Sequence, residues 1–155
     1  MARPPSPLKL QAHNRDDVTV LSAALQDAII RLGDIEHDRK ARTITFAANR
    51  YCWECDTAKR GWRVRAGVQI AGITQVQSRN IRQGASDAVI NLLQIRFEGV
   101  QTDESPEGEL ILVFSGDGEL RIAVECLDMV MADVSEPWLA SQAPDHDADE
   151  AGTTD

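Results

Sequence analysis

After residue 33 the apolar residues recur mainly at every second position, a period that is typical of pleated strands and not of helices. The stretch "RTITFAANRYCWE" predicts one strand, with Ile44, Phe46 and Ala48 on its inner face. The stretch "WRVRAGVQIAGITQVQSRNI" alternates for too long to be one ordinary strand. We expect it to form two strands, or one strongly bent strand, with Gly67 and Gly72 as places for the bend.

Two later stretches extend the predicted sheet. "AVINLLQIRFE" changes side-chain parity midway, which indicates a bulge or burial on both faces. Its expected inner residues are Ile90, Leu92, Ile95 and Phe97. "LILVFSGDGELRIAVECL" predicts a hairpin that turns at Asp117–Gly118, because a type I′ turn requires positive φ at both central residues.

Helical spacing is confined to the two ends of this pattern. From Asp16 to Arg31, apolar residues recur at intervals of three and four, with Asn14 or Asp16 as N-cap and Gly33 as the expected end. "DMVMADVSEPW" predicts a short helix that ends before Pro137. It would offer Met129, Val130 and Val134 to the core.

The predicted fold class is therefore α+β: an N-terminal helix, six to seven mostly antiparallel strands and a short C-terminal helix. A pleckstrin-homology-like split barrel is one architecture with about this strand number and a closing C-terminal helix. We expect a flexible N-terminal arm over residues 1–8, a single domain over 9–138 and a disordered acidic tail over 139–155.

Charge divides along the chain in a way that the overall net charge of −9 conceals. Residues 1–100 contain 15 Lys and Arg against 10 Asp and Glu, whereas residues 101–155 contain one Arg against 15 acidic residues. The prolines of "MARPPSPLKL" do not fit a secretory signal, and no apolar run is long enough to cross a bilayer. We therefore expect a cytoplasmic protein with no membrane contact.

Basic residues surround a tryptophan in "KRGWRVR" and continue in "SRNIR". Such a surface can be a solvated strand face, a contact for an anionic protein or for the chain's own acidic segments, or a nucleic-acid site. The acidic net charge disfavours nucleic acid. The candidate binding residues are Arg60, Trp62, Arg63, Arg65 and Arg79.

The only C-x-x-C pair lies in "YCWEC", at Cys52 and Cys55. A zinc site requires four ligands, and the remaining candidates are all single: Cys126, His13, His37 and His146. Residues three apart on a strand point to opposite faces, so we expect two packed cysteines more than a metal or redox pair. No metal or cofactor is predicted.

The sequence lacks the common catalytic motifs, such as a phosphate-binding glycine loop or G-x-S-x-G. In "GDIEHD", which predicts a short strand, His37 is expected to be an exposed strand-end histidine, with a general base as the alternative.

Five stretches resemble a bacterial family, domain-of-unknown-function family 2948, and together they cover most of residues 8–138. They are "DVTVLSAALQDAIIRLGDI", "ANRYCWE", "RVRAGVQIAGITQVQSRNI", "AVINLLQIRF" and "LRIAVECLDMVMADV". The resemblance implies one small domain and no assigned activity or functional residue. The family pattern favours a basic or aromatic residue at position 52, so it implies no family-wide role for the C-x-x-C.

These observations favour a small, non-catalytic interaction or accessory module that binds a protein partner or an identical subunit. The first alternative is an enzyme or metabolite-binding protein whose site is assembled from residues distant in sequence. The second alternative is weak nucleic-acid binding through Arg63 and Arg65.

Overall fold

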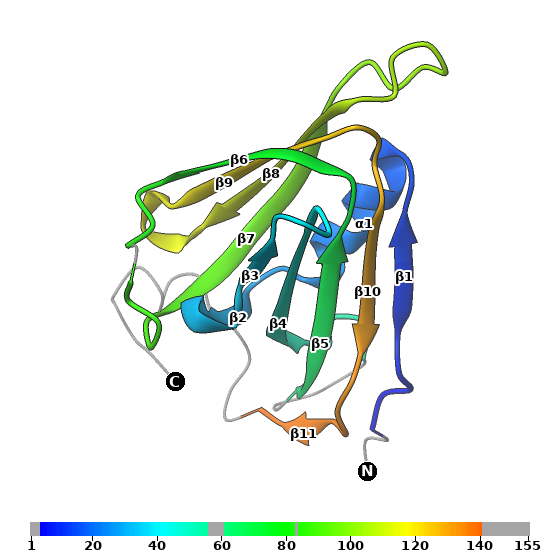
Figure 1. The fold of residues 1–155 in the computed structure, drawn as a ribbon. Coiled ribbons are helices and arrows are strands. Elements are labelled where there is room, and N and C mark those ends of the chain that lie inside the picture. Colours follow the sequence, from blue (N-terminus) through cyan, green and yellow to red (C-terminus); the bar gives the residue numbers. More distant parts are fainter. Residues whose placement is uncertain (1–3, 56–60, 83, 141–155) are drawn as a thin grey trace.

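The alternating segments form one antiparallel sheet in the computed structural model, which describes residues 4–55, 61–82 and 84–140 (Figure 1). This part of the chain contains eleven strands and a single α-helix. The helix is α1 (Arg15–Ala24), and two 3-10 turns are η1 (Leu32–Asp34) and η2 (Ser115–Asp117). The strands are β1 (Lys9–Ala12), β2 (Ala28–Arg31), β3 (Glu36–Asp38), β4 (Thr43–Tyr51), β5 (Trp62–Ile70), β6 (Ile73–Arg79), β7 (Val89–Glu98), β8 (Gly108–Phe114), β9 (Glu119–Val124), β10 (Met129–Asp133) and β11 (Trp138–Leu139).

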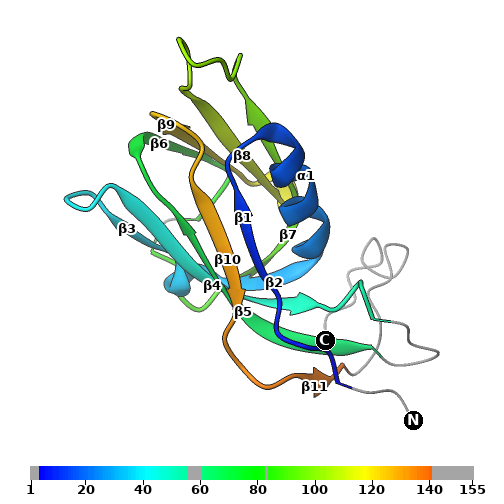
Figure 2. The ribbon, with the colours of Figure 1, turned by 90° about the vertical axis from the view of Figure 1, so that its right-hand side faces the viewer.

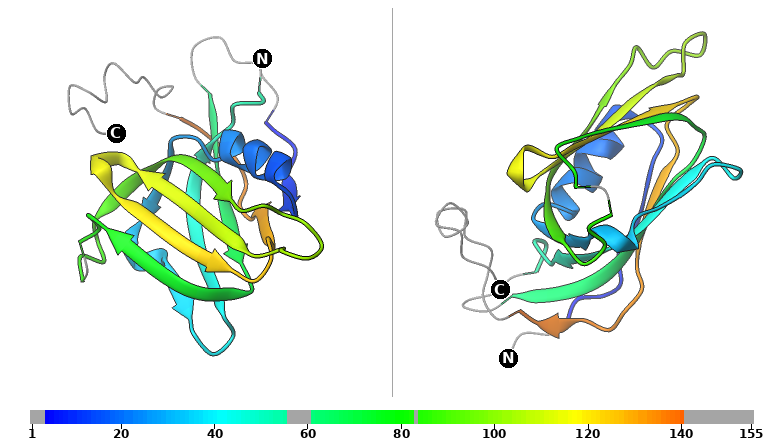
Figure 3. Two further views of the ribbon diagram at one scale, coloured as in Figure 1. Left: turned by 90° about the horizontal axis from the view of Figure 1, so that it is seen from above. Right: turned by 60° about the vertical axis from the view of Figure 1, so that its left-hand side comes forward.

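The sheet is rolled into two layers, with strand order β1-β10-β5-β4-β2-β7-β8-β9-β6. The two short strands β3 and β11 add to β4 and β5 respectively. Figure 3 (left) shows β8, β9 and β6, in yellow and green, in front of the layer that contains β4 and β5. The inner faces of both layers meet in one apolar core, which includes Ile44, Phe46, Leu112 and Ile122.

Gly72 is the point where the long alternating stretch passes from one layer to the other. Its φ of 71° is a left-handed conformation that glycine adopts readily. The predicted division of this stretch is therefore confirmed at Gly72, with β5 and β6 on either side. β6 pairs with β9 and not with β5.

The N-terminal helix is shorter than the sequence predicts. Asn14 is the N-cap, and its side chain accepts a hydrogen bond from the Asp17 N–H at 2.9 Å. The helix ends at Ala24, and Asp27 has a φ of 62°, which breaks the helical path before β2 begins. The expected helical residues 28–31 are strand β2, with Ala28 and Ile30 buried. The helix packs on β7, as Figure 2 shows.

The predicted C-terminal helix is wrong, and with it the α+β class and the pleckstrin-homology-like architecture that needs this helix. Residues 129–133 are strand β10, between β1 and β5. Met129 and Met131 are both fully buried, while Val130 is partly exposed, which is a period of two. Asp133 continues the inward-facing series, and its side chain is 2% exposed. The described residues form a mostly antiparallel β fold with one helix.

The hairpin and the bulge of the second layer are confirmed. β8 and β9 pair directly, but the two positive-φ turn residues are Gly116 (φ 74°) and Asp117 (φ 61°), one position earlier than predicted. In β7, the pairing register with β8 shifts between Leu92 and Gln94, at the predicted change of parity.

Residues near both ends of the described chain contact strands of the sheet. The Leu8 N–H donates to the Asp133 carboxylate at 2.8 Å, and Leu139 pairs with Trp62 in β11. Residues 1–3 of the predicted arm and residues 141–155 of the predicted tail lie outside the described residues. Among the described helices, none is long and apolar enough to cross a membrane.

Candidate functional site

Three of the five predicted binding residues lie at the start of β5, and a fourth lies elsewhere. Trp62, Arg63 and Arg65 belong to β5, while Arg79 is at the end of β6. Arg60 lies outside the described residues. The fold therefore does not place Arg79 on the same strand pair as the other three, because β6 pairs with β9.

The β5 arginines are bound to the protein's own groups. Arg63 is 9% exposed, donates to the Asn49 carbonyl at 3.0 Å and lies over the Tyr51 ring at 5.6 Å. Arg65 donates to the Asn49 side chain at 3.2 Å and to Asp34 at 3.1 Å. These contacts support neighbouring strands and leave little of Arg63 for a ligand.

The other two candidates differ from each other in exposure. The Trp62 ring nitrogen is buried and has no hydrogen-bond partner within the described part of the chain. Arg79 is 71% exposed and lies 3.9 Å from the Glu119 carboxylate.

The Asp34 carboxylate, which pairs with Arg65, has a shifted pKa. Hydrogen bonds from Arg31 and Arg65 hold the pKa of Asp34 below its usual range, against the opposing effect of burial.

A cleft of about 990 Å³ opens between the β3–β4 hairpin and β6. Neighbouring walls come from η1, from the loop after β6 and from the end of β9. The floor is apolar, because the inner faces of the two sheet layers continue into it. Its large apolar lining residues are Leu32, Ile35, Ile44, Ile73, Val76, Ile81 and Leu120.

The walls of this cleft are linked by hydrogen bonds between segments distant in sequence. On one side, the Arg42 side chain donates to the Ile73 carbonyl at 3.1 Å, and the Ile73 N–H donates back to the Arg42 carbonyl at 3.1 Å. On another side, the Gly33 N–H donates to the Ser86 carbonyl at 2.9 Å. A Cβ at Gly33 would lie 2.8 Å from that same oxygen, so close packing at this corner requires glycine.

Cationic side chains stand around the apolar floor. Arg42 forms an ion pair with Glu125 at 2.7 Å, and both side chains are exposed. Arg39 and Arg82 also line the cleft and are exposed, and neither side chain forms an ion pair or hydrogen bond within the described residues. His37, from β3, lies on the same lining. The cleft thus combines an apolar floor with two arginines that have no carboxylate partner in the described chain.

The C-x-x-C pair is arranged differently from the prediction of two cysteines on opposite strand faces. β4 ends at Tyr51, and the chain turns over residues 52–55, where the Cys55 N–H donates to the Cys52 carbonyl at 3.3 Å. The turn brings the two Cα atoms to 5.5 Å, and the sulfur atoms form a disulfide. Cys126 is a free, exposed cysteine. In the described ranges, no three His, Cys, Asp or Glu residues are grouped so that they could hold a metal.

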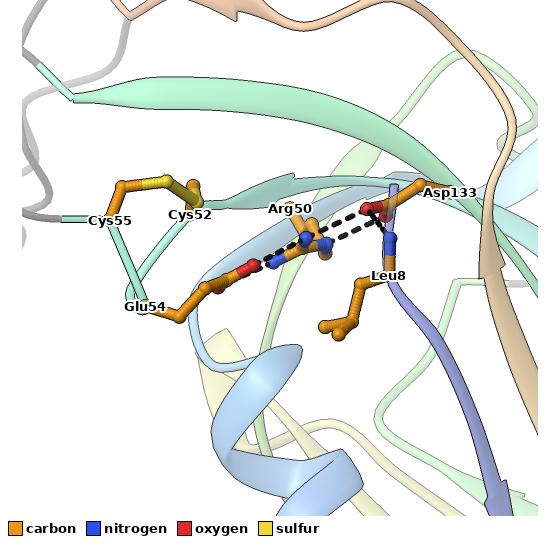
Figure 4. Close-up of a disulfide and its surroundings, with 6 residues drawn as sticks. All are labelled: Leu8, Arg50, Cys52, Glu54, Cys55 and Asp133. Carbon is orange, nitrogen blue, oxygen red and sulfur yellow. Dashed lines mark hydrogen bonds and ion pairs between the residues drawn. A yellow bond between two sulfur atoms is a disulfide. The ribbon is translucent and has the colours of Figure 1, made fainter. Parts of the chain in front are cut away.

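A buried arginine lies beside this disulfide. Arg50, at the end of β4, is 0% exposed and donates to Asp133 through Nε and Nη2, both at 2.8 Å. It also donates to Glu54 through Nη1 at 3.0 Å and Nη2 at 2.9 Å. Figure 4 shows the two carboxylates on opposite sides of the guanidinium group, with the disulfide next to Glu54.

Burial and hydrogen bonding shift the pKa values of Arg50 and Glu54 in opposite directions. Burial lowers the pKa of Arg50, but the hydrogen bonds to Asp133 and Glu54 outweigh it, so the pKa is raised above its usual value. For Glu54, burial alone would raise the pKa, but the hydrogen bonds from Arg50 outweigh burial, so the pKa of Glu54 is lowered. The group joins β4 to β10 and to the 52–55 turn, so it is a structural ion-pair cluster.

Sequence reasoning missed most of the cleft, because its lining comes from five separate segments. The sequence points to His37 by its position in a predicted short strand, and His37 does lie on the lining. Arg39 and Arg82 carry no motif, and only the folded chain brings them to one opening.

The fold and the cleft define a small domain of rolled antiparallel sheet with an open, apolar-floored, basic-rimmed cavity. A family model described as "Protein of unknown function (DUF2948)" matches residues 8–146, and the chain therefore belongs to this family. Neither the curated proteins nor the solved structures contain a match to the chain.

Proposed function

We propose that the protein is a non-catalytic binding module whose cleft holds a small amphipathic anion. By this we mean a molecule with an apolar body and a carboxylate, sulfonate or phosphate group. Small-molecule binding is one of the alternatives that the sequence left open, and the cleft is the observation that favours it.

The size and lining of the cleft support a small molecule. Its volume of about 990 Å³ is large enough for a ligand of drug size. The apolar floor favours a ligand that removes hydrocarbon surface from water, at about 25 cal/mol for each Å² buried. Ile44 and Ile73 are at most 4% exposed, so the floor is supported by the packed core.

The rim supports a negative group on that ligand. Arg39 and Arg82 have no acidic partner within the described residues, while the neighbouring Arg42 is already paired with Glu125. At physiological ionic strength, charges more than about 8 Å apart are screened. The net charge of −9 therefore has less influence on an anion in the cleft than these two nearby guanidinium groups have.

Binding without catalysis is supported by the surroundings of His37. Its side chain makes no hydrogen bond within the described chain, so no carboxylate orients it as a general base. The remaining charged lining residues are arginines, whose side chains have no hydrogen-bond acceptor, and Glu125, which is paired.

A matched pair of fluorescent probes tests this proposal. 8-Anilinonaphthalene-1-sulfonate has an aromatic body and a sulfonate, and N-phenyl-1-naphthylamine has the same body without the charge. We expect the wild-type protein to bind the sulfonate probe more tightly than the neutral probe. Changing Arg39→Gln and Arg82→Gln together should weaken it by about tenfold, at up to about 1 kcal/mol for each exposed charge contact. Binding of the neutral probe should stay unchanged.

The control is Arg96→Gln, which removes an exposed arginine on β7 that pairs with Glu98 and does not line the cleft. It should leave both probes unaffected, and circular dichroism should show that all variants are folded. Equal affinity of the sulfonate for wild type and the double variant, or equal weakening of both probes, would contradict the proposal.

A protein partner or an identical subunit, cytoplasmic location and the Arg63–Arg65 nucleic-acid site remain predictions from the sequence. Light scattering of purified protein over a concentration series tests self-association. Titration of labelled single-stranded RNA at low salt, with Arg65→Gln as the variant, tests nucleic-acid binding.

A further inference from the structure

The two sulfur atoms of the Cys52–Cys55 disulfide differ in their surroundings. Cys52 follows β4 directly and is 1% exposed. Cys55, at the end of the turn, is only partly buried. An incoming thiolate can therefore approach Cys55 from solvent and not Cys52, which makes Cys52 the leaving group.

We propose that this disulfide is a reversible thiol–disulfide exchange site for a dithiol reductant, and that its reduction releases Glu54 from Arg50. This proposal is independent of the cleft and of the function proposed for it.

The exchange proceeds in two steps. A thiolate of the dithiol bonds to the Cys55 sulfur, the Cys52–Cys55 bond breaks, and Cys52 leaves as a thiolate that takes a proton from water. The second thiol of the reductant then attacks the mixed disulfide and frees Cys55 as a thiol. The dithiol is oxidised to its disulfide, and the protein pair gains two electrons and two protons.

Its place in the fold argues against a role as a simple brace. The bond spans a sequence separation of three, so it closes a very short loop and joins no distant elements. Loop-closure stabilisation is smallest for such loops. The connection between β4 and β10 at this point is made by Arg50 and Asp133, which hydrogen-bond directly.

The turn nevertheless connects the redox state to that buried group. Glu54 lies between the two cysteines, and its carboxylate takes two hydrogen bonds from Arg50 while its side chain is 43% exposed. Figure 4 shows the disulfide joining Cys52 and Cys55 across the turn that carries Glu54. When the bond opens, residues 52–55 regain conformational freedom. The exposed Glu54 carboxylate can then replace its hydrogen bonds from Arg50 with hydrogen bonds from water.

The first experiment measures exchange in the folded protein. The Cys126→Ser variant is used so that alkylation followed by mass spectrometry counts only Cys52 and Cys55. We expect dithiothreitol to reduce the pair at a rate proportional to its concentration, with unchanged circular dichroism, and oxidised glutathione to restore the bond. Reduction that needs denaturant, a rate that levels off because opening limits it, or thiols that do not pair under oxidised glutathione would overturn the proposal.

Two single-cysteine variants test the direction of attack, again without Cys126. Cys55, left alone by Cys52→Ser, should react with an aromatic disulfide reagent at least tenfold faster than Cys52 left alone by Cys55→Ser. Equal rates would refute the assignment of Cys55 as the attacked sulfur.

The second experiment measures the link to Glu54 as the difference in Tm between oxidised and reduced protein. Closure of so short a loop corresponds to a difference of about 4–8 °C. In Glu54→Ala, the difference should be smaller by a few degrees, because Arg50 has already lost that partner. Glu98→Ala, which removes an exposed carboxylate distant in sequence, is the control. An unchanged redox difference in Glu54→Ala would overturn the link.

Discussion

Asp133→Asn should be the most damaging conservative substitution in the polar part of this molecule. Asp133 is 2% exposed and accepts three hydrogen bonds, two from Arg50 and one from the Leu8 N–H. Asparagine keeps the shape, but one oxygen becomes an NH₂ group that faces other donors. Arg50 would then be a fully buried cation whose one remaining carboxylate, Glu54, is 43% exposed.

The expected cost follows from that burial. Removing one partner of a buried ion pair costs about 3–5 kcal/mol, against about 0–1 kcal/mol for an exposed pair. For a chain of this size, 1 kcal/mol corresponds to roughly 2–4 °C, so Tm should fall by about 6–20 °C. At a urea slope of about 2 kcal/mol per molar, the unfolding midpoint should fall by about 2 M.

Urea unfolding followed by circular dichroism measures this loss of stability. The matched control is Arg96→Gln, which breaks an exposed pair of 3.4 Å and should change stability by less than about 0.5 kcal/mol. A loss of less than about 1 kcal/mol in Asp133→Asn, at an unchanged urea slope, would refute our account of the Arg50 group.

Three further predictions concern separate parts of the fold. Asn14→Ala should cost about 1 kcal/mol in urea unfolding, because the Asp17 N–H loses its cap, and no change would contradict the capping role. Gly33→Ala should weaken sulfonate-probe binding, because its Cβ would meet the Ser86 carbonyl and displace a cleft wall; unchanged binding would show that the wall is not confined by this contact. Glu54 has a pKa lowered in the folded state, so its stabilisation is present above about pH 4.3, the usual value in an unfolded chain, and is lost as the pH falls through the folded value. Unfolding in acid should therefore be less pH-dependent in Glu54→Gln, and an equal pH dependence would contradict the role of the Arg50 hydrogen bonds.

Strand positions could be predicted wherever one face is buried and the other is solvated. In β4, Ile44, Phe46 and Ala48 are all at most 2% exposed, as the alternation indicated. Strand position is not evident from alternation where a polar residue faces inward. Asp133 in β10 interrupts the apolar series, and the local pattern does not reveal its partner, because Arg50 lies 83 positions away.

Two chain reversals also could not be predicted from the local sequence pattern. Ala28, Ile29 and Leu32 continue the helical spacing of α1, but the positive φ at Asp27 ends that path and starts β2. Cys52 and Cys55 would point apart on a strand, yet β4 ends one residue before Cys52. Neither break has a glycine or proline to mark it.

The cleft could not be predicted because it depends on how the sheet rolls. Arg39 and Arg82 are separated in sequence by strands β4, β5 and β6, and each is an ordinary exposed arginine when taken alone. Their common location follows from the passage of the chain between layers at Gly72 and from the hydrogen bonds of Arg42 and Gly33.

The most direct test of the central claim is a titration of the isotope-labelled protein with the sulfonate probe, followed by backbone amide NMR. We expect the largest shifts at the cleft lining, including the amides of His37, Val76 and Gly84, and no comparable shifts in β1. Saturable shifts confined to that lining would support a ligand-binding cleft. Shifts that are absent there, or that are largest on β1 and β10, would contradict it.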